Sequence, residues 1–230
     1  MKTFKIALLA ASATLAMSGA ALADDALTVS YNVGAASDYV FRGVSQTDEN
    51  PQIFAGVDVA KGMVYGGLWA SNVDFGDDTS AEIDVYAGVK PTIGPVTLDL
   101  GAIYYGYVNE PSNADWAYWE FKAAGSMPVG PATVGAAVFY SPDQTGAFDE
   151  SFYYELNGSV PVAKKVTISG AVGRQTYSNA FDWADYTTWN LGAGYAVNEH
   201  FGLDLRYFDT DEELGHLYGS RVVASVKAAF

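Results

Sequence analysis

Cysteine is absent from the 230-residue chain, which excludes disulfide bonds and metal sites built on thiolates. Long hydrophobic runs are missing too: 50% of the residues are hydrophobic, yet no stretch beyond the amino terminus reaches the roughly 18 residues of a membrane-spanning helix. Basic side chains are few, because 12 Lys and Arg stand against 27 Asp and Glu, giving a formal net charge of −15. Such an acidic chain does not bind nucleic acid through its charge.

The amino terminus has the pattern of a targeting segment. Its first five residues include two lysines, an apolar run covers residues 6–17, and Ala21-Leu22-Ala23 follows. A charged region, a short apolar region and an A-x-A site together predict a secretory signal peptide over residues 1–23. An anchoring helix is the alternative, but the run falls short of the about 20 apolar residues that span a bilayer. We therefore expect residues 24–230 to form one exported domain.

The carboxyl terminus alternates between apolar and polar side chains. Counting back from Phe230, every second residue to Val222 is apolar, whereas Arg221 and Lys227 have the other parity. Because side chains of a strand point alternately to its two faces, this segment has one apolar face and one face that tolerates charge. An aromatic last residue on the apolar face resembles the assembly signal of bacterial outer-membrane barrels. We expect Phe230 to engage the barrel-assembly machinery.

The same alternation recurs along the chain and predicts about twelve strands, an even number as in single-chain outer-membrane barrels. The 24 glycines and 16 tyrosines suit many glycine-containing strands with aromatic belts at the membrane interfaces. We therefore expect an all-β fold, a closed antiparallel transmembrane β-barrel. The expected strands cover residues 27–42, 52–60, 63–72, 81–89, 96–108, 116–127, 132–140, 152–160, 166–177, 186–197, 201–209 and 219–230.

The connections between these strands form two alternating sets. One set is longer and acidic, and the other is shorter and holds Lys61, Lys90, Lys164 and Lys165. Barrels have short periplasmic turns and longer outer loops, so the longer set is expected outside. A soluble β-sandwich is the alternative, but it would turn one strand face to water, and these apolar faces are nearly unbroken by charge. The longer set covers residues 45–51, 73–80, 109–115, 141–151, 178–185 and 210–218.

Charged side chains occupy the polar faces of the expected strands. An Arg or Lys that faces lipid at the midplane costs about 2–4 kcal/mol, so these side chains are expected in a wet or well-paired interior. They either line a water-filled pore or pair across a plugged lumen, and a barrel of about twelve strands allows both. Arg174 is an exception, because its parity places it on the lipid face near the outer end. The residues expected to line the lumen are Asp38, Arg42, Asp58, Asp84, Asp99, Glu120, Lys122, Glu155, Asp204, Arg206, Arg221 and Lys227.

The most individual part of the chain is the segment from Ser37 to Thr47, which reads SDYVFRGVSQT and is followed by Asn50-Pro51 and Gly56. It resembles the opening of the TorF porin family, and the later segment from Tyr65 to Val73 is similar to that family's next block. The likeness is strongest over residues 27–90. It implies an outer-membrane β-barrel with channel activity, and it supplies neither a substrate nor a catalytic site.

Few residues suggest chemistry, and we expect no catalytic residue, metal ligand or cofactor. The two histidines, His200 and His216, lie in connections of opposite sets and are expected to be solvated. A lipid hydrolase is the alternative, in which His216 activates Ser220 and the third group is Asp211 or Glu213. Loops rich in Asp and Glu supply such triplets by chance, which disfavours this alternative.

The sequence thus predicts a channel for passive diffusion of small hydrophilic solutes or ions in the bacterial outer membrane, reached by export through the periplasm. Its partners would be outer-membrane lipid and lipopolysaccharide, and its acidic loops would enrich cations and give mild cation selectivity. The acidic runs at 74–78 and 209–213 lack the pattern of an EF-hand loop, so we expect solvated loops rather than Ca²⁺ sites. The alternative function is a closed structural or adhesive barrel that acts through these loops.

Overall fold

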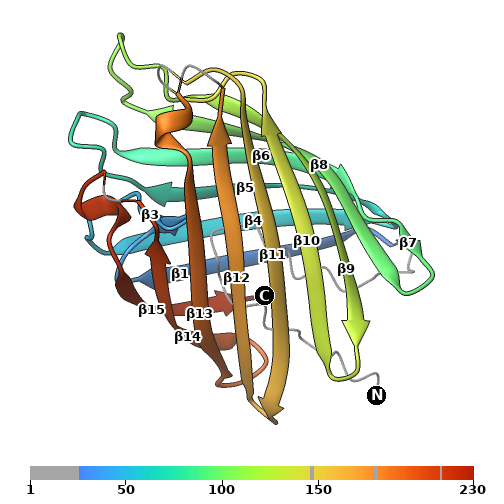
Figure 1. The fold of residues 1–230 in the computed structure, drawn as a ribbon. Coiled ribbons are helices and arrows are strands. Elements are labelled where there is room, and N and C mark those ends of the chain that lie inside the picture. The colour runs from blue at the N-terminus through green and yellow to red at the C-terminus, as the bar shows by residue number, and fades with distance from the viewer. Residues whose placement is uncertain (1–25, 146–147, 179–180, 213) are drawn as a thin grey trace.

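The computed structural model describes residues 26–145, 148–178, 181–212 and 214–230, in which twelve long strands close into an antiparallel barrel (Figure 1). The all-β barrel that the alternation predicts is therefore confirmed. The predicted signal peptide, residues 1–23, lies outside the described residues. Across the described ranges, no helix has the length and hydropathy needed to cross a bilayer.

The wall strands follow one another around the barrel in chain order, each hydrogen-bonded to the next. They are β1 (Thr28–Ala36), β4 (Gln52–Lys61), β5 (Val64–Asn72), β6 (Ala81–Val89), β8 (Val96–Val108), β9 (Tyr118–Val129), β10 (Ala132–Ser141), β11 (Ser151–Ala163), β12 (Val166–Tyr177), β13 (Tyr186–Ala196), β14 (Phe201–Thr210) and β15 (Arg221–Ala229). Short elements fill the connections, namely β2 (Val40–Phe41), β3 (Val44–Ser45), β7 (Thr92–Ile93) and the 3₁₀ turns η1 (Asp182–Ala184) and η2 (His216–Tyr218).

The barrel closes where the first wall strand meets the last. β1 pairs with β15 in a register that places Val33 opposite Ala228. Beyond this ladder the backbone amide of Tyr31 donates to the carbonyl of Phe230 at 3.0 Å, and the Phe230 amide returns a bond of 2.9 Å. The His200 ring stacks on the Phe230 ring with centroids 5.3 Å apart. The last residue is therefore part of the closure, and none of the twelve wall strands has an unpaired edge that could template aggregation.

Side chains separate by parity along each wall strand, as β14 illustrates. Leu203 and Leu205 are 44% and 57% exposed on the outer circumference, whereas Arg206 and Phe208 are 2% and 5% exposed inside the barrel. Successive residues of a strand face opposite sides, so a period of two in the sequence becomes an apolar outer surface and a polar interior. The sidedness predicted for this strand agrees with the structure.

The first predicted strand, residues 27–42, is wrong at its carboxyl end. β1 ends at Ala36, and the backbone amide of Ser37 bonds to the Ala224 carbonyl at 2.9 Å before the chain leaves the wall. Tyr39, which the alternation placed on the lipid face, is only 5% exposed and lies inside the barrel. The error arose because the inserted segment is itself extended, so its alternation continues that of β1.

The two sets of connections lie at opposite ends of the barrel (Figure 1). At one end, strands join through tight turns such as Gly62-Met63 and Lys164-Lys165. Gly62 has a φ of 57°, which fits the left-handed conformation of a two-residue hairpin. At the other end the connections are longer, and they include the segment from residue 37 to residue 51. The partition predicted from loop length therefore matches the structure.

Close approach of strands to inward tyrosines generates the first prediction. A Cβ atom on Gly88 would lie 2.5 Å from the Leu100 carbonyl oxygen and 2.5 Å from the Tyr65 hydroxyl. Because the carbonyl belongs to the neighbouring strand and cannot yield, Gly88→Ala should lower the free energy of unfolding by about 1–3 kcal/mol. Urea titration in detergent, followed by the gel mobility of the folded barrel, measures this loss.

Gly158→Ala is the matched control, since the nearest atom to its added Cβ, the Thr133 carbonyl oxygen, is 3.5 Å away. Its unfolding midpoint should stay close to that of the parent protein. Equal losses for the two variants would show that strand approach does not limit side-chain size at Gly88.

Candidate functional site in the barrel interior

The segment 37–51, here called the inner hairpin, connects β1 to β4 and folds into the barrel instead of extending away from it. Its short strands β2 and β3 pair with each other, and the turn between them consists of Arg42 and Gly43. Both turn residues have positive φ, 49° and 86°, as a two-residue hairpin turn of type I′ requires. Glycine adopts this conformation freely, but arginine does so at a cost, which the contacts of its side chain must offset.

The base of the inner hairpin is fixed by the carboxylate of Asp38. Ser45 Oγ donates to Asp38 Oδ1 at 2.7 Å, and Thr47 Oγ1 lies 2.9 Å from the same oxygen. Thr47 is fully buried, and its hydroxyl also accepts the Tyr39 amide at 3.1 Å. On the wall side, Arg221 Nη1 of β15 donates to Asp38 Oδ2 at 2.9 Å. One carboxylate thus holds the hairpin together and ties it to the wall.

The tip of the inner hairpin is held by an ion pair across the barrel. Arg42 Nη1 and Nη2 donate to the two carboxylate oxygens of Glu120, on β9, at 2.7 and 2.8 Å. Gln175 Oε1, on β12, accepts a further bond from Nη1 at 3.2 Å, and Tyr105 Oη donates to Glu120 Oε2 at 3.0 Å. Arg42 is 7% exposed and Glu120 1%. A bidentate pair of this kind is both strong and directional.

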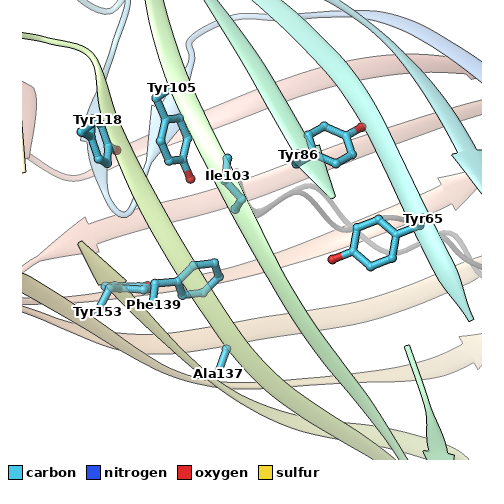
Figure 2. Close-up of a cluster of buried hydrophobic side chains, with 8 residues drawn as sticks. All are labelled: Tyr65, Tyr86, Ile103, Tyr105, Tyr118, Ala137, Phe139 and Tyr153. Atoms are coloured by element: carbon cyan, nitrogen blue, oxygen red, sulfur yellow. The ribbon is translucent and has the colours of Figure 1, made fainter. Parts of the chain in front are cut away.

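Aromatic rings surround the Arg42 guanidinium. Its Cζ atom lies 4.6 Å from the ring centroid of Phe41, 4.9 Å from that of Phe139 and 4.3 Å from that of Tyr153. These distances are within the range of cation–π attraction, which strengthens when the cation is desolvated. Figure 2 shows Phe139 and Tyr153 together, with Tyr105 and Tyr118 on the neighbouring strands. The cation is therefore stabilised by its rings as well as by its carboxylate.

The rest of the inner hairpin meets the remaining wall. Tyr39 Oη donates to Glu82 Oε1 of β6 at 2.7 Å, and its ring lies 5.4 Å from that of Trp69 on β5. Val40 joins a buried cluster with Phe208 of β14 and Val223 of β15. A Cβ atom on Gly43 would overlap Thr188 of β13 and Thr210 of β14. The inner hairpin thus meets the wall strands from β5 round to β15.

A second layer of charged side chains lies toward the short turns. Asp99 Oδ2 is 2.8 Å from Lys122 Nζ and 3.5 Å from Lys90 Nζ, while Tyr65 Oη donates to Asp99 Oδ1 at 2.6 Å. In the same way Tyr86 Oη donates to Asp58 Oδ1 at 2.6 Å. This layer is less buried than the hairpin layer, since most of its charged side chains are only half-buried.

Further around the interior, Arg206 forms the centre of a polar network. Its Nε lies 3.2 Å from Asp204 Oδ1, and its Nη1 donates to Asn190 Oδ1 at 2.6 Å. Glu155 accepts bonds from Asn157 Nδ2 at 2.9 Å and from Tyr153 Oη at 3.2 Å. Opposite charges are thus interleaved along the inner wall.

The structure brings the residues predicted to line the lumen into these two layers. Asp38, Arg42, Glu120 and Arg221 belong to the inner hairpin and its contacts. Asp84 is buried on β6, at 2% exposure. The layer toward the short turns contains Asp58, Asp99, Lys122, Asp204 and Arg206, with Lys227 partly buried on β15. Glu155 accepts a bond from Tyr153, whose ring packs on the Arg42 guanidinium, so it belongs with the contacts of the inner hairpin.

Several contributors to the interior were not predicted as site residues, among them Glu82, Gln175 and Tyr39. Glu82 and Gln175 have the inward parity of their strands, so that parity could have identified them. Tyr39 could not be found in this way, because its parity within the apparent first strand indicated lipid. Its hydrogen bond to Glu82 spans 43 positions of sequence, which no local pattern reports.

The residues considered for other chemistry lie apart from the interior. His216 Nε2 is 2.7 Å from Asp48 Oδ1 in the loops, so this nitrogen is bound to a carboxylate, and Glu213 lies outside the described residues. Arg174, the outward arginine, donates from Nη1 to Thr187 Oγ1 at 3.2 Å and has Nη2 3.5 Å from Asp185 Oδ2. Among the described residues, no three His, Asp or Glu side chains gather as metal ligands would.

The burial of the Arg42–Glu120 pair generates the second prediction. Arg42→Met or Glu120→Gln alone should lower the free energy of unfolding by about 3–5 kcal/mol, because each leaves a buried partner uncompensated. The double variant should lose less than the sum of the single losses, with a coupling of about 0.5–3 kcal/mol. Urea titration of the four proteins measures this coupling.

The matched control cycle uses Arg174→Met and Asp185→Asn, since this pair joins side chains that are 44% and 19% exposed. Its coupling should be about 0–1 kcal/mol, as for other solvated pairs. A coupling at Arg42 and Glu120 no larger than this control would contradict the assignment of a strong interior ion pair.

Solved structures with this fold include several outer-membrane proteins. The KdgM porin superposes with a TM-score of 0.62 at 8% identity, covering 87% of this chain and 99% of that chain. The NanC porin gives 0.57 at 10% identity, covering 88% and 99%. An outer membrane channel from Pseudomonas putida F1 gives 0.53 at 12% identity, covering 91% and 97%. At these identities the likeness shows the fold alone.

Sequence comparison identifies the family. A comparison with curated proteins found no match. A family model described as a bacterial protein of unknown function (Gcw_chp) matches residues 20–230, which include every wall strand and the inner hairpin. The chain therefore belongs to the Gcw_chp family of bacterial proteins.

Proposed function

We propose that this protein is a porin-like channel of the bacterial outer membrane that lets small hydrophilic solutes or ions diffuse passively. The observation that carries the proposal is the closed barrel with an apolar outer surface and a charged interior. A lipid-facing charge is costly and a closed barrel satisfies all its backbone groups, so this arrangement suits a bilayer around a polar lumen. The likeness to the KdgM and NanC porins and the resemblance of residues 37–47 to the TorF porin family support the proposal.

The proposed orientation follows from the two ends of the barrel. Short turns face the periplasm in bacterial barrels and longer loops face outward, so we place the acidic connections outside. This orientation agrees with export by the predicted signal peptide and with a role for Phe230 in recognition by the barrel-assembly machinery. The outer surface would then contact outer-membrane lipid, and the long loops would lie beside lipopolysaccharide.

Mild cation selectivity is part of the proposal, and the charge of the barrel supports it. Exposed carboxylates such as Asp74, Asp77 and Asp78 lie in the long connections. Carboxylates of one sign at a mouth concentrate cations there, although salt screens the effect. In the second layer, by contrast, the interleaved charges have little net sign, so selectivity would arise at the outer end.

One observation favours a second function. The inner hairpin contacts the wall from β5 to β15, which is the arrangement expected of a permanently filled lumen. A barrel filled in this way would be structural or adhesive and would act through its acidic outer loops. Conductance separates the two functions directly.

The third prediction concerns conductance and its ion preference. Purified protein in a planar lipid bilayer should give discrete conductance steps, with a reversal potential of cation sign across a KCl gradient at low salt. The preference should fade as salt rises, because the Debye length falls from about 10 Å at 0.1 M to about 3 Å at 1 M.

The matched variant for this measurement carries Asp74→Asn, Asp77→Asn and Asp78→Asn in one outer loop. Its cation preference should be weaker while its conductance at high salt stays near that of the parent. A reversal potential of anion sign in the parent protein would contradict the proposed selectivity. Absence of steps in the parent would favour the closed structural barrel.

A further inference from the structure

We infer that the inner hairpin, residues 37–51, is the element that limits flow through the barrel, and that the Arg42–Glu120 ion pair holds it in the closed position. This inference rests on the proposed channel function and assigns the constriction within it. Three features of the structure support it. The wall strands β1 and β4 pair directly, internal hydrogen bonds hold the hairpin together, and one buried ion pair fixes its tip.

The wall is complete without the inner hairpin. β1 and β4 pair directly in register from Thr28 opposite Ala60 to Ala36 opposite Gln52. Of the intervening residues, Ser37 bonds to the closing strand β15, with its amide donating to the Ala224 carbonyl at 2.9 Å. The paired strands β2 and β3 of the hairpin bond to each other and not to the wall ladder. A connection of a few residues would join these two strands, as it does in ordinary hairpins. The additional length places polar and aromatic side chains across the lumen.

The inner hairpin is built as one unit. Asp38 binds Ser45 and Thr47 across it, and the amide of Gln46 donates to the carbonyl of Tyr39 at 2.7 Å. These bonds are internal, so they persist if the hairpin shifts relative to the wall. Movement of the tip would break chiefly the contacts of Tyr39, Arg42 and Val40 with the wall.

The tip contact is the one that a single change can release. The Glu120 carboxylate accepts hydrogen bonds from both terminal nitrogens of Arg42. The other contacts of the guanidinium are with aromatic rings and with Gln175. A buried cation that loses its carboxylate is costly to keep out of water. The unusual backbone conformation of Arg42 adds a further cost, which disappears if the turn relaxes. Loss of the Glu120 charge should therefore shift the hairpin away from the wall.

The fourth prediction tests the constriction by removing it. Replacement of residues 38–50 by two glycines leaves Ser37 and Pro51 to complete a four-residue turn between the paired ends of β1 and β4. In planar bilayers this variant should give steady conductance several-fold above that of the parent. Glu120→Gln should give an intermediate result, with more frequent openings than the parent.

Arg174→Ala is the matched control, because it removes an arginine that binds Thr187, Asp185 and Asp211 outside the lumen. Its conductance should equal that of the parent. Each protein is first shown to be a folded barrel by the change in gel mobility on heating. If the shortened variant fails to fold, Glu120→Gln and Arg42→Ala carry the test, and unchanged conductance in both overturns the inference.

The outcomes separate this inference from the proposed function. A folded shortened variant that conducts no more than a conducting parent overturns the hairpin as the constriction, while the channel function stands. A folded shortened variant that passes no ions contradicts the channel function itself and the inference with it. A large increase of conductance in the shortened variant, without any change in Glu120→Gln, would show that the Arg42–Glu120 ion pair does not hold the hairpin closed.

Discussion

Alternation of side chains across each strand is the constraint on which the rest of this structure depends. Because every wall strand is paired on both sides, its backbone groups are satisfied within the sheet, and only the side chains distinguish the two faces. Leu203 and Leu205 on the outside and Arg206 on the inside show how far the environments of successive residues differ. A shift of one residue in any strand would turn its charges outward and its apolar side chains inward, so register and sidedness are specified together.

This constraint also determines which side chains fill the interior. Charges excluded from the outer face must be accommodated inside, where each needs a partner. The structure provides partners in two layers: tyrosines and lysines around Asp99 toward the short turns, and the inner hairpin with Glu120 toward the long loops. The Arg42 guanidinium satisfies one of the most deeply buried carboxylates, while its own backbone adopts a conformation that arginine seldom takes. The paired strands of the inner hairpin, β2 and β3, thus contribute to the interior without joining the wall ladder.

Local periodicity explains why most of the fold could be predicted from the sequence. The later strands and the alternating loop lengths follow from a period of two and from turn chemistry, which neighbouring residues encode. The end of the first strand could not be predicted, because Tyr39 and Phe41 continue the parity of β1 although they belong to the inner hairpin. The bond between Arg42 and Glu120 joins positions 78 residues apart, and such pairing depends on the closed barrel. Glu120 has the inward parity of β9, but Arg42 lies beyond the end of β1 in the turn of the inner hairpin, so no local pattern could show that the two side chains bind each other.

The most direct test of this sidedness is a spin-label scan of β14 in lipid bilayers, for which the cysteine-free chain provides a clean background. Single cysteines at positions 203 to 206 would carry a nitroxide, and relaxation by dissolved oxygen, which concentrates in lipid, would be measured at each. Labels at Leu203 and Leu205 should be relaxed strongly and labels at Asp204 and Arg206 weakly. An inverted pattern, or equal relaxation at all four positions, would contradict the account of an apolar outer surface around a polar interior.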